Sequence, residues 1–79
     1  MTSLALIDGT RHLEAIALES LAERFGTPLY VYSRAALTAN YQAFDNAFAD
    51  VEHQVCFAVK ANSNIAVLNV LARLGAGFD

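Results

Sequence analysis

The residue of this chain best placed for chemistry is Lys60, its single lysine. Lys60 directly follows Val55–Val59, a continuous apolar run that is typical of a parallel strand covered on both faces. The carboxyl ends of parallel strands surround the active sites of α/β proteins, and a partly desolvated lysine there can attack carbonyl compounds as an amine nucleophile. The alternative is a solvated lysine that shields the strand end and has no chemical role.

The side chains expected on the face of Lys60 are small. Strand periodicity places Cys56, Ala58 and Lys60 on one face and the larger residues of the run on the other. This arrangement leaves room beside the amine for a flat ring. Since a lone cysteine cannot form an internal disulfide, we interpret Cys56 as a reduced and buried small hydrophobic residue.

Two helices and a strand are expected before the lysine strand. Three-four spacing of apolar residues predicts an amphipathic helix over Leu13–Phe25, and Gly26 ends it. After a proline, the aromatic and β-branched run Leu29–Tyr32 is expected as a strand. Ser33 can cap the next helix, although the acidic partner of a capping box is absent at Ala36. The apolar stripe of that helix consists of Leu37, Tyr41, Phe44 and Phe48.

A helix and the start of a further strand are expected after Lys60. The polar residues 62–64 form a turn and most simply cap the helix that follows, although a helix start can also bind an anion. The helix covers Ile65–Leu74 and is ended by Gly75, and Phe78 and Asp79 open the next strand. Strands that alternate with helices at this spacing indicate βαβ units and an α/β sheet or barrel.

Composition and charge exclude several classes of protein. The net charge of −3 argues against nucleic acid as a partner, and a hydrophobic share of 56% argues against disorder. No stretch is long and apolar enough for a membrane span, and the first residues lack the pattern of a secretory signal, so we expect a cytoplasmic protein. With only 16% charged residues in 79, the chain reads as an amino-terminal piece whose surface a larger protein covers.

A metal site is not expected. His53 and Cys56 have the spacing of two ligands, but the chain offers no convincing set of four. Gly75 and Gly77 are interpreted as a helix stop and a turn and not as a dinucleotide fingerprint.

The stretch around Lys60 resembles a known cofactor motif. Residues 57–64 read Phe-Ala-Val-Lys-Ala-Asn-Ser-Asn, which resembles the pyridoxal phosphate lysine motif of the alanine racemase-like, fold-type III enzymes. Residues 25–33 and 71–79 further resemble the start of the diaminopimelate decarboxylase branch, and the resemblance covers about residues 17–79. Alanine racemases usually continue the motif with an Ala-Tyr-Gly-His type sequence, and eukaryotic ornithine decarboxylases usually have Cys in place of Ala61, so the motif favours the diaminopimelate branch.

This resemblance implies a fold and a division of the chain. The fold is α/β, the N-terminal part of a pyridoxal phosphate-binding (β/α)8 barrel of the TIM type, incomplete and limited to its first one or two βα units. Residues 34–79 would start the barrel domain. Residues 1–33 would form a helix and a strand that belong to a second, β domain of a homodimeric enzyme.

The resemblance also implies an activity, the decarboxylation of meso-diaminopimelate to L-lysine and CO2. Lys60 would bind pyridoxal phosphate covalently and, once released, move protons; Ala58 would lie beside the ring. Asp79 would support the charge of the lysine, or it is an exposed carboxylate without a role. A decarboxylase of another basic amino acid and a non-catalytic α/β fragment remain alternatives. The chain alone is expected to be inactive, since the family's phosphate-binding loop and substrate ligands lie on later strands.

Overall fold

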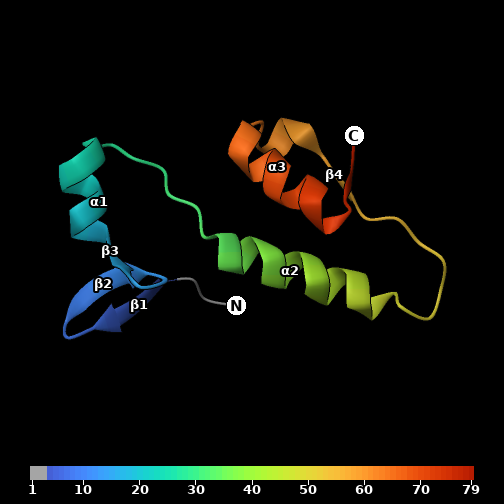
Figure 1. The fold of residues 1–79 in the computed structure, drawn as a ribbon, viewed down its shortest axis with the longest axis horizontal. Coiled ribbons are helices and arrows are strands. Elements are labelled where there is room, and N and C mark those ends of the chain that lie inside the picture. The colour runs from blue at the N-terminus through green and yellow to red at the C-terminus, as the bar shows by residue number, and fades with distance from the viewer. Residues whose placement is uncertain (1–3) are drawn as a thin grey trace.

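The computed structural model describes residues 4–79 as an elongated chain with two groups of elements (Figure 1). Its radius of gyration is 15.0 Å, against about 12 Å for a compact domain of this length. No helix in the described part is long and apolar enough to cross a membrane. In chain order the elements are β1 (Leu4–Ile7), β2 (Thr10–Leu13), β3 (Ile16–Ala17), α1 (Leu18–Phe25), α2 (Arg34–Ala47), β4 (Cys56–Phe57), the 3-10 helix η1 (Val59–Ala61), α3 (Ile65–Leu74) and β5 (Gly77–Phe78).

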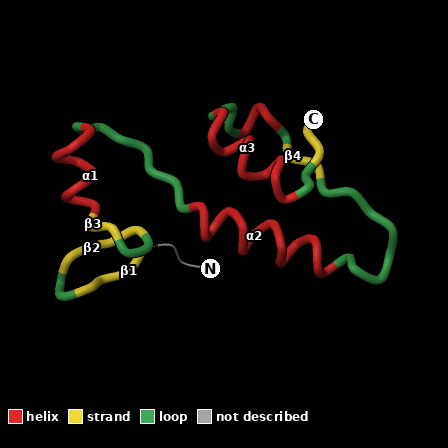
Figure 2. Tube along the Cα trace, viewed as in Figure 1, coloured by secondary structure: helices red, strands yellow, loops and turns green. Residues whose placement is uncertain are grey.

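Two tight turns fold the first three strands into an antiparallel meander (Figure 2). Asp8 and Gly9 join β1 to β2 with φ angles of 52° and 77°, and a two-residue hairpin turn with two positive φ angles is the type I′ turn. Glu14, with φ of 56°, begins the two-residue turn between β2 and β3. The meander therefore occupies residues that the apolar spacing had assigned in part to a helix.

The expected helix over Leu13–Phe25 is wrong at its start, because α1 begins at Leu18. Leu13 and Ile16 are partners across β2 and β3, and Leu13 is buried. A two-residue turn brings residues three apart face to face, as a helix also does, so spacing alone does not separate the two structures. The end of the helix at Gly26 is confirmed, with φ of 81°.

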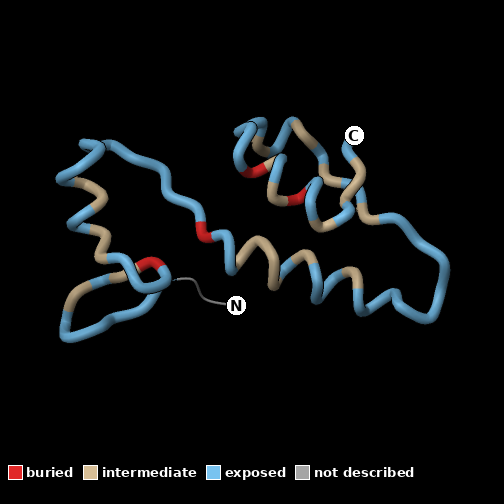
Figure 3. Tube along the Cα trace, viewed as in Figure 1, coloured by how far each residue is buried: buried red, intermediate tan, exposed pale blue. Residues whose placement is uncertain are grey.

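The segment Leu29–Tyr32 is not the expected strand. No strand among residues 4–79 pairs with it, although it is extended, and Tyr30 is 88% exposed. Figure 3 shows it as a run of exposed residues that links α1 to α2. Its composition favours extended backbone, but a strand also needs a partner for its hydrogen bonds.

Ser33 caps α2, as expected, with help from the meander. Its Oγ accepts a hydrogen bond of 3.0 Å from the backbone N–H of Ala36 and donates one of 2.8 Å to Glu14 Oε2. The same carboxylate oxygen accepts from the N–H of Ala35 at 3.4 Å. Glu14 thus adds, from a distant turn, an anionic acceptor at the start of α2, and its hydrogen bond to Ser33 ties the two halves of the chain together.

A βα unit with its next strand forms the second half of the chain. Strands β4 and β5 are parallel neighbours, and α3 connects them. Asn64 caps α3 by accepting from the N–H groups of Ala66 and Val67, and Gly75 ends it with φ of 103°. Val67 and Leu71 are buried, and α3 packs against α2. The expected helix over Ile65–Leu74 and the strand after it are confirmed.

His53 fastens the chain between α2 and β4. Its Nε2 lies 2.7 Å from Asp45 Oδ1, and its Nδ1 lies 2.8 Å from the carbonyl oxygen of Val51. Both neighbours only accept hydrogen bonds, so the ring satisfies both when it carries two protons. The Val51 carbonyl and the Asp45 carboxylate therefore raise the pKa of His53 above its ordinary value of 6.5.

We predict that Glu14→Ala loosens the first turn of α2. Alanine keeps the Cβ atom at the positive φ, so the change removes the carboxylate without relieving the backbone. The loss of one capping acceptor costs about 1 kcal/mol, which speeds hydrogen exchange at Ala35 and Ala36 about fivefold. Hydrogen exchange followed by NMR measures this rate, with the exposed Glu19→Ala as the matched control. Equal rates in the two variants would contradict the role of Glu14.

We also predict that His53 titrates above pH 6.5 in an NMR titration of its ring protons. Because its folded-state pKa is raised, the His53 contact stabilises the fold fully below the unfolded pKa, and this contribution is lost as the pH rises through the folded pKa. Asp45→Asn should lower the pKa, since the amide carries no charge. A His53 pKa that Asp45→Asn leaves unchanged argues against the contact.

Candidate functional site

The backbone pairing around Lys60 is longer than the two short strands. The N–H of Gly77 donates to the carbonyl of Val55 at 2.9 Å, and the N–H of Asp79 donates to that of Phe57 at 2.9 Å. The N–H of Val59 then donates to the carbonyl of Asp79 at 3.0 Å. Parallel pairing thus runs along the whole of Val55–Val59, so the parallel strand predicted there is confirmed.

Burial alternates along this strand with the period of two that the sequence predicts. Cys56, Ala58 and Lys60 are exposed, whereas the residues between them are half-buried. The predicted small-residue face beside the lysine is therefore present. The prediction that Cys56 is buried is wrong, because no element among residues 4–79 buries that face of the strand.

Lys60 lies one residue beyond the last hydrogen bond of the parallel pair. It is the central residue of η1, whose turn is closed by hydrogen bonds from Ala61 N–H to the Ala58 carbonyl at 3.0 Å and from Asn62 N–H to the Val59 carbonyl at 3.1 Å. The amine thus stands at the carboxyl end of the strand, as expected, but a 3-10 turn and not the strand itself sets its direction.

Asp79 reaches the same edge of the sheet from the neighbouring strand. Its backbone pairs with Phe57 and Val59, which places it beside the end of the lysine strand. Both side chains are exposed, and they form no salt bridge; within residues 4–79 the ion pair found is that of His53 and Asp45. The structure thus places Lys60 and Asp79 at one edge of the sheet, but their side chains form no ion pair.

Gly77 is a residue whose role the sequence did not reveal. It was interpreted as part of a turn, but it lies in β5 opposite Cys56. A Cβ atom on Gly77 would lie 3.1 Å from the Cys56 Sγ and 3.3 Å from the Gln54 Nε2. Gln54 Nε2 in turn donates to the carbonyl of Gly75 at 3.2 Å. The glycine therefore lets β5 approach β4 closely while Gln54 holds the turn before it.

This arrangement fits a flat ring that carries an aldehyde. Lys60 offers an exposed amine, and the two residues before it on its strand face, Ala58 and Cys56, are small, as is Gly77 beside Cys56 on the neighbouring strand. No group of three potential metal ligands occurs among residues 4–79, and both ring nitrogens of His53 are already engaged. The reactive group that the site offers is an amine nucleophile, and its natural reaction partner is an organic carbonyl group.

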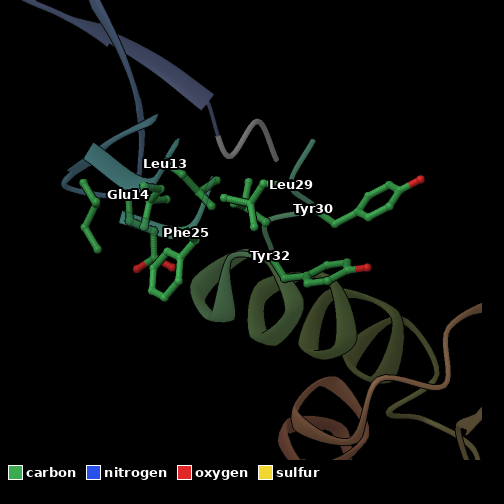
Figure 4. A pocket seen from close by; sticks show the side chains of 9 residues that line it. Leu13, Glu14, Phe25, Leu29, Tyr30 and Tyr32 are labelled. Carbon is green, nitrogen blue, oxygen red and sulfur yellow. The ribbon is translucent and has the colours of Figure 1, made fainter. Parts of the chain in front are cut away.

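An apolar groove lies elsewhere in the chain. A groove of about 410 Å³ opens between α1, the meander and the extended segment, and Figure 4 shows Phe25, Leu29, Tyr30 and Tyr32 around it. Lys60 does not line this groove. The residues that line the groove are Leu13, Glu14, Ile16, Leu21, Phe25, Leu29, Tyr30, Val31 and Tyr32.

Residues 34–79 match a protein family described as "Pyridoxal-dependent decarboxylase, pyridoxal binding domain". The matched region contains α2, the parallel pair, Lys60 and Asp79. It makes up more than half of the chain.

Similar proteins carry consistent names. A diaminopimelate decarboxylase of Pseudomonas aeruginosa is 60% identical over 79 residues, which are 100% of this chain and 19% of that protein. The crystal structure of AQ1208 from Aquifex aeolicus matches with a TM-score of 0.89 at 43% identity, over 98% of this chain and 19% of that one. A diaminopimelate decarboxylase from M. jannaschii in complex with L-lysine matches with a TM-score of 0.85 at 37% identity, over 98% and 19% of the two chains. The chain thus spans about a fifth of the length of these relatives.

Proposed function

Because the chain belongs to the pyridoxal-dependent decarboxylases, through their pyridoxal-binding domain, we propose that it is the lysine-bearing segment of a diaminopimelate decarboxylase. The enzyme would break the bond between the carboxylate and the D-centre of meso-diaminopimelate, release CO2 and place a proton on that carbon, which yields L-lysine. The observation that carries the proposal is the exposed amine of Lys60 beside a face of small residues, at the end of a parallel strand.

Lys60 and Ala58 would hold the cofactor, pyridoxal 5′-phosphate. When bound, the cofactor supplies a ring that accepts the electron pair left by the departing CO2. Lys60 would anchor the ring through its side-chain amine, the nucleophile of the site. The Lys60 amine would also hold or deliver a proton at the reacting carbon of the substrate. Ala58, two residues before it on the same exposed face, leaves the space that a flat ring needs.

Asp79 would act on Lys60 electrostatically. Its backbone is fixed by two hydrogen bonds next to the end of the lysine strand, and its carboxylate belongs to the adjacent strand of the same edge. A carboxylate at this edge would attract the positively charged Lys60 side chain and help to orient it. Asp79 is therefore proposed as a cofactor-site residue that works through Lys60.

The division of the chain at Ser33 is a further part of the proposal. Residues 1–33 would belong to a second, β domain, and residues 34–79 would begin the barrel; residues 1–3 lie outside the described part. Support comes from the unpaired segment Leu29–Tyr32, whose backbone can pair with a strand, and from the apolar groove that it lines.

The complete enzyme is proposed to be a cytoplasmic homodimer that binds neither nucleic acid nor membrane. Its family resemblance supports the dimer, and the net charge of −3 opposes attraction to phosphates. Sedimentation of the complete enzyme at the mass of a monomer would contradict the dimer.

The role of Lys60 can be tested in a chimera in which this chain replaces the matching segment of the Pseudomonas aeruginosa enzyme, with which it aligns over all 79 residues. Lys60→Ala should lower kcat by about a thousandfold or more, because the amine that anchors the cofactor and moves protons is lost. Formation of L-lysine from meso-diaminopimelate is the measurement.

Two controls frame this test. Arg73→Ala removes an exposed cation of α3 and should leave activity within about twofold, since a surface charge contributes little. The 79-residue chain alone, supplied with pyridoxal phosphate, should form no L-lysine. A Lys60→Ala chimera that keeps the activity of the unsubstituted chimera refutes the proposed function.

The proposed division predicts different hydrogen exchange at Leu29–Tyr32 in two contexts. In the isolated chain these amides have no strand partner among residues 4–79 and should exchange at nearly the rate of an unfolded peptide. In the chimera, a later strand should pair with them and slow exchange about a hundredfold or more. Hydrogen exchange followed by mass spectrometry measures both, with the α3 peptide as an internal control. Equally fast exchange in both proteins would rule out the pairing.

A further inference from the structure

The position of Lys60 is set by the turn that follows the parallel pair. The last hydrogen bond of the pair is donated by Val59, so the sheet fixes the backbone up to that residue only. From Lys60 onward the chain leaves the sheet within η1, a single 3-10 turn. Short 3-10 turns have poorer hydrogen-bond geometry than α-helices and need support from outside.

Asn62 supplies that support on both sides of the turn. Its backbone N–H donates to the carbonyl of Val59 at 3.1 Å and closes η1. Its side-chain Oδ1 accepts from the N–H of Asn64 at 3.0 Å, which bends the chain toward α3. Asn62 is half-buried, and its backbone is extended, with φ of −162° and ψ of 111°. One residue thus links the end of the lysine turn to the start of the next helix.

The link ends at the first turn of α3, next to its buried residue Val67. Asn64 Oδ1 accepts from the N–H groups of Ala66 and Val67 at 2.9 and 3.2 Å, and Val67 is among the few buried side chains. Through two successive side-chain amides, the end of the sheet is joined to the first turn of α3, a helix that packs on α2. The backbone is therefore held on both sides of the Lys60 Cα, by the sheet before it and by α3 after it.

We propose that Asn62 is a positioning residue for Lys60 and sets the rate at which its amine captures the cofactor aldehyde. The inference rests on the proposed function. A lysine stem has four rotatable carbons, so the amine reaches a reacting carbon efficiently only when its Cα is held in place. Asn62 does not touch the cofactor in this account; it acts through the turn that carries Lys60.

The test uses the cofactor-free chimera and follows the rate at which added pyridoxal phosphate becomes bound. Absorbance of the bound cofactor gives the rate, and borohydride reduction with peptide mapping confirms attachment at Lys60. Asn62→Ala should slow capture about tenfold or more, because the turn loses its link to α3. Asn62→Asp retains an oxygen acceptor for the Asn64 N–H and should restore most of the rate.

A matched variant separates positioning from a general loss of stability. Ser33→Ala removes the cap of α2 and should lower the melting temperature of the cofactor-free chimera at least as much as Asn62→Ala, while leaving capture at the unsubstituted rate. If Asn62→Ala captures cofactor as fast as the unsubstituted chimera, or if Ser33→Ala is slowed equally, the inference is overturned and the proposed function stands. An unsubstituted chimera that carries no cofactor on Lys60 overturns both.

Discussion

The parallel backbone pairing of Val55–Val59 with Gly77–Asp79 is the constraint on which the site depends. Its inter-strand hydrogen bonds bring two residues 19 positions apart, Lys60 and Asp79, to one edge of a sheet. Gly77 eases this pairing, because a Cβ atom there would lie 3.1 Å from the Cys56 Sγ. The pairing thus places an exposed amine, the small residues before it on its strand and a carboxylate at one edge of the sheet.

Many large apolar side chains of the described residues are exposed. Among residues 4–79 the buried apolar side chains are Leu13, Val67 and Leu71, while large ones such as Tyr30 and Phe78 are exposed. A chain with a fifth of its relatives' length cannot enclose a barrel, which needs about 250 residues. With so few buried side chains, local hydrogen bonds contribute much of the order. Glu14 accepts one from Ser33, Asn62 accepts one from Asn64 after the lysine turn, and side chains cap α2 and α3.

The elements predicted correctly from the sequence are those whose structure local chemistry decides. Gly26 and Gly75 end helices, Ser33 begins one, and the apolar run before Lys60 is a parallel strand. The features predicted wrongly or missed are those that contacts between distant residues decide. The spacing of Leu13 and Ile16 suits a helix and a hairpin equally, although Asp8-Gly9, the usual signal of a two-residue turn, was available. The link of Glu14 to Ser33 crosses 19 residues, and no pattern in the sequence announces it.

The central claim is that Lys60 alone carries the cofactor, and peptide mapping tests it most directly. The chimera with the Pseudomonas aeruginosa enzyme is loaded with pyridoxal phosphate, reduced with borohydride, digested and mapped by mass spectrometry. The account predicts a phosphopyridoxyl group on Lys60 and on none of the lysines contributed by the rest of the chimera. A label on another lysine, or no label at all, would contradict it.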